Sequence, residues 1–117
     1  MKTILVVDDE PGILDLLTVL LDEEGYVVLP VGDGVAALDV LAETAVDVVI
    51  TDVMMPRLGG VGLIRAIRAR EDGRSVPAIL VSAGDRPSLD GLGASVFLAK
   101  PFDLDELLDA VHGAVSR

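Results

Sequence analysis

The chain has 117 residues, a formal net charge of −11 and no cysteine. A chain of this length forms one domain with a real core, and the lack of cysteine excludes disulfides, thiolate metal sites and a cysteine nucleophile. Residues 1–52 contain twelve acidic residues and one basic residue, whereas residues 53–117 contain eight of each, so we expect no direct binding to nucleic acid, whose phosphates need Lys and Arg.

Apolar segments of two kinds alternate along the chain. Short runs rich in β-branched residues predict strands, and longer segments with apolar residues at helical spacing predict helices. The predicted strands are Thr3–Val7, Tyr26–Leu29, Val46–Thr51, Ala78–Val81 and Val96–Ala99. The first predicted helix starts at Pro11, the second follows the capping residue Asp33, the third follows a loop from Pro56 to Gly60, and the last follows Asp103. The third helix is predicted to end near Asp72–Gly73.

Residues at the helix ends support these boundaries. Pro11 suits a first helical turn, and Gly25 suits the position just past a helix end. Asp33 is a typical N-cap residue. Asp103 and Glu106 form an acidic version of the capping box at the start of the last helix.

The alternation of strands and helices predicts an α/β fold. Such an order gives a parallel sheet with right-handed crossovers, and five strands of this kind suggest a flavodoxin-like, doubly wound sheet in the order 2-1-3-4-5. The whole of residues 1–117 is expected to form this single domain. The apolar run Ile4–Val7 is too short for a signal peptide or a membrane span, so we expect a cytoplasmic protein without membrane insertion.

The stretch from Asp47 to Pro56 contains the residue around which we place the function. Its apolar run reads as a strand buried on both faces, and Asp52 follows at the carboxyl end of that strand. In open α/β sheets, ligands bind at this edge. Asp8 and Asp9 end the first strand, so three carboxylates are expected to meet there.

The residues expected at this edge form a set suited to phosphoryl transfer. Carboxylates that repel one another favour a bound cation, and oxygen ligands of this kind suit Mg²⁺. Ser82 ends the fourth strand with a hydroxyl, and Lys100 ends the fifth with an ammonium. Taken alone, Asp8-Asp9 could be a helix cap, Ser82 a strand-end residue and Lys100 a surface charge. Together they suggest a phosphoryl-transfer site in which one aspartate can become an aspartyl phosphate, with a metal and Lys100 neutralising its oxygens.

Four stretches carry a resemblance to a known family. They are ILVVDDE (4–10), VVITDVMMPRLGG (48–60), ILVSAG (79–84) and GASVFLAKPF (93–102). Over essentially its whole length, the chain resembles the receiver domain of bacterial two-component response regulators. The resemblance implies a signalling switch that accepts a phosphoryl group from a histidine kinase or a histidine phosphotransfer protein and then binds an unknown output protein.

The resemblance also implies roles for individual residues. Asp52 would be the phosphoacceptor. Asp8, Asp9, Asp52 and the backbone carbonyl of Met54 would bind Mg²⁺, with Mn²⁺ as an alternative ion, and Asp9 would do so more directly than Asp8. Ser82, the backbone N–H of Ala83, and Lys100 would bind the phosphoryl oxygens.

Further roles concern the switch itself. Phe97 matches an aromatic residue that turns inward on phosphorylation in relatives, although it could be a plain core residue of the fifth strand. The Lys100–Pro101 bond is expected to be cis. Met54 and Gly84 stand where relatives tune hydrolysis, and neither side chain can orient a water, so we expect a fairly long-lived phosphoryl state. No enzymatic activity is expected beyond slow self-phosphorylation from small donors and self-dephosphorylation.

The segment between Ser82 and Lys100 departs from the family pattern. Relatives place their fourth helix there, and this chain lacks about one helical turn of that length. Gly84, Pro87, Gly91 and Gly93 also disfavour a long helix, so we expect that helix to be shortened or irregular. A hybrid or phosphorelay role then gains weight, and so does the alternative of an atypical receiver that acts mainly as a protein-interaction module.

Two other functions compete less well. A phosphatase with an aspartate nucleophile would need Asp-x-Asp after the first strand and a cap domain, and an FMN binder would need a phosphate loop where three acids stand. The arginines at 65, 68, 70 and 74 are read as a solvated helix face and the loop after it. The opening Met1-Lys2-Thr3 looks like a natural start, which favours a stand-alone or N-terminal receiver.

Overall fold

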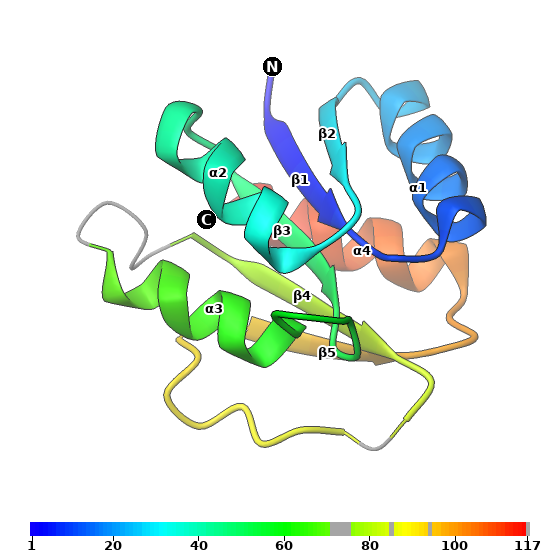
Figure 1. The fold of residues 1–117 in the computed structure, drawn as a ribbon. Helices are drawn as coiled ribbons and strands as arrows, with labels where there is room; N and C mark the ends of the chain where they lie inside the picture. Colours follow the sequence, from blue (N-terminus) through cyan, green and yellow to red (C-terminus); the bar gives the residue numbers. More distant parts are fainter. Residues whose placement is uncertain (71–75, 85, 94, 117) are drawn as a thin grey trace.

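The computed structural model describes residues 1–70, 76–84, 86–93 and 95–116 (Figure 1). The strands are β1 (Thr3–Val7), β2 (Val27–Val31), β3 (Val48–Asp52), β4 (Ala78–Ser82) and β5 (Ser95–Ala99). The helices are α1 (Pro11–Glu23), α2 (Gly34–Glu43), α3 (Gly60–Ala69) and α4 (Leu104–Val115). Each predicted strand and helix is present, with boundaries that differ by a few residues.

The five strands form one parallel sheet in the order β2-β1-β3-β4-β5, which confirms the predicted fold class. β3 lies at its centre, and its five residues are all buried. The register pairs Asp52 with Val81 and Ser82 with Ala99. The polar residues at the ends of these strands therefore reach the same edge of the sheet.

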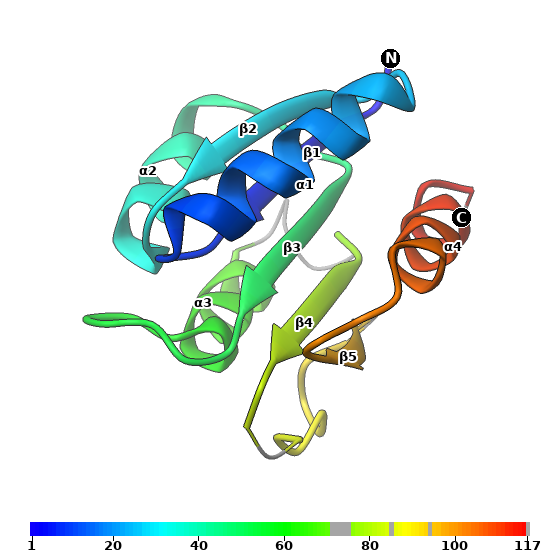
Figure 2. The same cartoon turned by 90° about the vertical axis from the view of Figure 1, so that its right-hand side faces the viewer.

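Helices cover both faces of the sheet (Figures 1 and 2). One apolar cluster joins strand residues such as Ile50 to α1 and α4 through Leu17 and Leu107. The other joins Val49 to α3 through Leu63 and Ile64, and residues of α2 pack against it. Alternate residues of β3 thus serve opposite cores, as expected for a strand buried on both faces.

Most of the predicted helix ends are correct. Gly25 follows α1 with φ +92°, and the N–H groups of Gly25 and Tyr26 donate to carbonyls of the last helical turn, which is a Schellman ending. The Asp33 carboxylate accepts from the Ala36 N–H at 2.8 Å. Asp103 caps α4, but it accepts from the N–H of Asp105 and not from that of Glu106. The second and third N–H groups of a helix both lack helical partners, so either can take the cap.

The segment after β4 contains no helix in its described residues 83–84 and 86–93. This agrees with the expectation of a shortened or irregular helix. Leu92 is nevertheless fully buried in the α3-side core, and its carbonyl accepts from Arg68 Nε at 2.7 Å and from Ser95 Oγ at 2.8 Å. An irregular chain is therefore anchored to the core at Leu92, and Leu89 packs against the same cluster.

The arginines in α3 and just after it differ in part from the prediction of a solvated helix face and loop. Arg65 is exposed, but Arg68 and Arg70 are half-buried and bind backbone carbonyls, the latter that of Leu41 at 2.9 Å. Burial lowers the pKa of Arg68. Because the described residues 86–93 form no helix, the Leu92 carbonyl can accept from a side chain of α3. Arg74 and the expected helix end near residues 72–73 lie outside the described residues, and α3 ends at Ala69.

No helix in the described parts of the chain has both the length and the apolar character that crossing a membrane requires.

Candidate functional site at the carboxyl edge of the sheet

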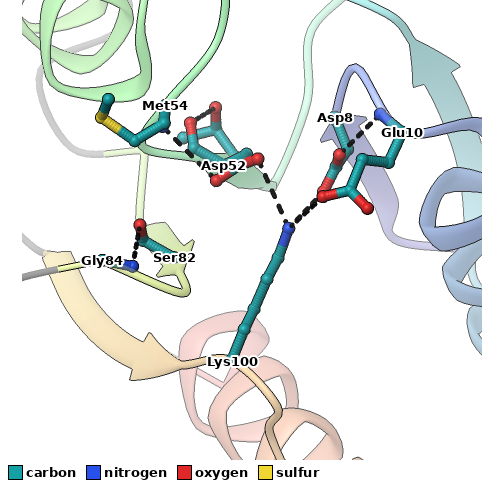
Figure 3. A network of polar contacts seen from close by, with 8 residues as sticks. Asp8, Glu10, Asp52, Met54, Ser82, Gly84 and Lys100 are labelled. Atoms are coloured by element: carbon teal, nitrogen blue, oxygen red, sulfur yellow. Dashed lines mark hydrogen bonds and ion pairs between the residues drawn. The ribbon is translucent and has the colours of Figure 1, made fainter.

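Four polar residues follow from the ends of four strands and meet at one edge of the sheet (Figure 3). Asp8 comes directly after β1, Asp52 ends β3, Ser82 ends β4 and Lys100 comes directly after β5. Asp8, Asp52 and Ser82 are buried, with 1%, 5% and 2% of their surface exposed. Parallel strands of similar length bring these side chains together, which is the convergence predicted from the chain order.

Lys100 links the carboxylates. Its Nζ lies 3.2 Å from Asp8 Oδ2 and 3.4 Å from Asp52 Oδ2, and a third contact of 3.4 Å reaches Glu10 Oε1. Figure 3 shows the side chain extended from the end of β5 toward the gap between Asp8 and Asp52. One ammonium therefore faces three carboxylates, so negative charge is in excess.

The site changes the acidity of its central groups. Burial raises the pKa of Asp52, the Asp8 charge adds to this, and Lys100 opposes it. For Lys100, burial acts to lower the pKa, but the hydrogen bond and charge of Asp8, together with Asp52, outweigh it and raise that pKa. Lys100 stays charged, while Asp52 lacks full compensation for its buried charge.

The carboxylate cluster differs in one member from the expected set. Within the described chain, one carboxylate oxygen each from Asp8, Glu10 and Asp52 lie within 4.8 Å of one another. Asp9 is exposed and lines the adjoining cavity. Glu10 was not predicted as part of the site. Its N–H donates to Asp8 Oδ1 at 2.9 Å, so the chain folds back, and Pro11 at the first helical position marks Glu10 as the N-cap residue. Pro11 was the feature of the sequence that could have indicated the position of Glu10 at the start of α1.

This donor set fits a hard divalent cation. The ligand atoms are carboxylate oxygens, the cluster carries excess negative charge, and a cavity of about 240 Å³ adjoins it. Mg²⁺ prefers such oxygens and keeps several waters, for which a cavity of this kind leaves room. The residues present therefore form an acidic pocket suited to Mg²⁺.

Met54 and the residues from Ser82 to Gly84 also line this cavity. Ser82 Oγ accepts from the Gly84 N–H at 3.1 Å, which leaves the hydroxyl hydrogen free to donate. Ala83 lines the same space and is exposed. The Met54 N–H donates to Asp52 Oδ1 at 3.4 Å, while its side chain is largely exposed.

Phe97 and Pro101 lie outside this cluster. Phe97 is half-buried on β5 and packs against the core that includes Leu92. The Lys100–Pro101 peptide bond is cis, as the resemblance implies.

Comparison with known families gives the decisive observation. The sequence-family model of the response regulator receiver domain matches residues 4–112. The chain belongs to this family. The four polar residues described above lie at its strand ends, and receiver domains act as phosphorylation-activated switches in two-component signalling. Nothing in these comparisons indicates an enzymatic activity for the receiver.

Individual relatives agree with this assignment. The receiver is 37% identical over 120 residues to the response regulator GtcR of Aneurinibacillus migulanus, covering 99% of this chain and 48% of that protein. It is 41% identical over 118 residues to the response regulator MprA of Mycobacterium sp. (strain KMS), covering 97% and 50%. The chain thus spans about half the length of the curated relatives it matches.

Solved structures share the fold. The receiver domain of the Francisella response regulator 1452 superposes with a TM-score of 0.89 at 30% identity, covering 100% of this chain and 98% of that one. The response regulator TrrA of Thermotoga maritima, solved in complex with Mg²⁺-BeF, has a TM-score of 0.86 at 34% identity and covers 97% and 99%.

Proposed function

We propose that Asp52 is the phosphoacceptor of a receiver formed by residues 1–117. A carboxylate oxygen of Asp52 attacks the phosphorus of a phosphohistidine on a histidine kinase or phosphotransfer protein. The new O–P bond forms as the P–N bond breaks, and the leaving imidazole nitrogen takes up a proton. The observation that carries this proposal is the meeting of the buried Asp52 with Lys100 beside an open cavity.

Other residues of the cavity have supporting roles in this proposal. Asp8, Asp9, Glu10, Asp52 and the Met54 carbonyl would hold Mg²⁺ or Mn²⁺, which supplies positive charge for the phosphoryl oxygens when bound. Lys100 pairs with one phosphoryl oxygen, and the free Ser82 hydroxyl hydrogen donates to another. The backbone N–H of Ala83 is a further donor. Fixed donors around the transferred group lower the barrier mainly by electrostatic stabilisation.

The response to phosphorylation would be a population shift. The phosphoryl dianion attracts Ser82, the residues after β4 follow, and Phe97 moves inward in the state that a partner recognises. An output protein reads that state in a hybrid or phosphorelay setting. The absence of a helix in described residues 86–93 favours one competing candidate, a receiver that acts mainly as an interaction module.

Intact-mass spectrometry after incubation with acetyl phosphate and Mg²⁺ tests the assignment. We expect one phosphoryl adduct on the wild-type chain, slow self-phosphorylation without a kinase, the same adduct with Mn²⁺, and no adduct on Asp52→Asn. Absence of an adduct on the wild-type chain would favour the interaction module. Sustained turnover of the donor would instead indicate a phosphatase.

A further inference from the structure

The loop between β3 and α3, residues 53–59, folds tightly over the end of β3. The Gly60 N–H donates to the Val53 carbonyl at 3.0 Å. A Cβ at Gly60 would lie 2.3 Å from the Asp52 carbonyl oxygen, and one at Gly59 would lie 2.8 Å from that of Val53. Because Met54 belongs to this loop and bonds to Asp52 Oδ1, the loop's path sets how Met54 faces the site.

The first turn of α2 touches this loop at Leu58, which follows Gly34 by 24 residues in the chain. A Cβ at Gly34 would lie 2.6 Å from the Leu58 carbonyl oxygen and 3.0 Å from Leu58 Cβ. A Cβ at Gly62 would lie 2.9 Å from Leu58 Cδ1. Leu58 is therefore close to two glycines, and at Gly34 only a residue without a side chain allows the α2 backbone to approach this closely.

A charged contact joins the same two segments. Arg57 forms an ion pair with Asp33, the N-cap residue of α2. Arg57 has a φ of 68°, a left-handed conformation that is uncommon for non-glycine residues and is kept where surrounding contacts hold it. The Asp33 carboxylate thus uses Oδ1 for the Ala36 N–H and Oδ2 for Arg57.

The two contacts differ in strength. The Arg57 side chain is 64% exposed, and exposed ion pairs contribute little because water screens them and ordering the side chains costs entropy. The contact between Gly34 and Leu58 involves backbone atoms at close range, which cannot yield without a shift of the helix or the loop. A substitution at Gly34 should therefore displace the β3–α3 loop more than a substitution at Asp33.

From this geometry we propose that the first turn of α2, through Gly34 and Asp33, positions the β3–α3 loop for metal binding at Asp52. The proposal rests on the proposed function, which places the Met54 carbonyl among the metal ligands. Gly34 and Asp33 are positioning residues, since they reach the site only through Leu58 and Arg57. Residues that orient ligands in this way commonly change metal affinity by about tenfold or more when altered.

The experiment compares Gly34→Ala with Gly113→Ala in the full chain. Both changes add one methyl group to a helix, but a Cβ at Gly113 meets nothing within 4 Å. The first measurement is the position of the Met54 and Leu58 amide signals by NMR without metal. The second is the dissociation constant for Mg²⁺ alone, by calorimetric titration. For Gly34→Ala we expect shifted signals and an affinity loss of about tenfold, with Gly113→Ala like the wild type.

A second variant guards against a folding defect in Gly34→Ala. Asp33→Asn keeps an N-cap side chain and loses the charge that holds Arg57, so we expect a smaller shift of the same signals at unchanged thermal stability. Met54 signals and Mg²⁺ affinity that match Gly113→Ala in both variants would overturn the positioning role. A wild-type chain that binds Mg²⁺ but yields no adduct would overturn the proposed function alone. If the wild-type chain binds no Mg²⁺, the metal-free signals still decide the positioning role.

Discussion

The Lys100 ammonium lies 3.4 Å from Asp52 Oδ2, although β4 separates β5 from β3 in the sheet. The side chain therefore extends across one strand and also reaches Asp8, which follows β1 on the far side of β3. One cation thus compensates the carboxylates of two strands. A change at Lys100 should affect stability, metal binding and phosphorylation together.

Replacing Lys100 by Met should destabilise the metal-free chain. Asp8 and Asp52 would lose their shared counter-charge, and removal of one partner from a buried pair leaves an uncompensated charge. We expect a loss of about 1–3 kcal/mol in the free energy of unfolding. Urea unfolding at pH 7 with a chelator measures it, and Mg²⁺ should restore part of the loss. An unchanged midpoint in the metal-free state would contradict this account.

The Asp52→Asn variant should be more stable than the wild type at neutral pH without metal. Burial raises the pKa of Asp52 above its ordinary value of 3.8, so the folded protein holds this proton more tightly than the unfolded one. The stability that the wild-type chain gains from holding this proton is fully present below pH 3.8. It is lost as the pH rises through the raised pKa of Asp52 in the folded protein.

Chemical denaturation at a series of pH values checks this sign. The advantage of Asp52→Asn should be present at pH 7 and should shrink as the pH falls toward 3.8. Mg²⁺ should reduce the advantage by stabilising the wild-type chain. If the wild-type chain is more stable than Asp52→Asn at pH 7 in chelator, the attraction of Lys100 for the Asp52 carboxylate outweighs the cost of burying its charge.

Met54→Asn should shorten the lifetime of the phosphorylated state. The Met54 side chain lines the cavity and cannot hold a water by hydrogen bonding, whereas an amide can. One such hydrogen bond is worth about 1 kcal/mol, or about fivefold in rate. Decay of the adduct by mass spectrometry measures it, with Val19→Asn as an exposed control on α1. Equal decay in Met54→Asn and the wild type would count against a role for this position.

Leu92→Ala should destabilise the chain although Leu92 itself does not lie in a helix. Leu92 is fully buried among residues of α3 and β4, so its truncation leaves a cavity in the core. We expect a loss of about 2–4 kcal/mol. Leu16→Ala, at a side chain that is 48% exposed, should change stability by only about 0.5 kcal/mol. Thermal or urea unfolding compares the two, and similar midpoints would mean that Leu92 is no anchor.

The sequence alone predicted the sheet and the meeting of four polar residues at one edge of it. Alternating strand and helix patterns leave few topologies, and parallel strands end at a common edge. Asp8, Asp52, Ser82 and Lys100 each follow a short apolar run, so their meeting follows from chain order alone. The caps at Gly25 and Asp33 were predictable because they depend on a few neighbouring residues.

Only the tertiary structure decided the contacts between segments remote in the chain. Glu10 lies in the carboxylate cluster with Asp52, and Arg68 binds the Leu92 carbonyl. The approach of Gly34 to Leu58 belongs to the same group. The spacing of apolar residues predicts which face of a helix or strand is buried. It does not predict which partner packs against that face or at what distance. Those details depend on side-chain packing across the assembled layers, and no local pattern encodes them.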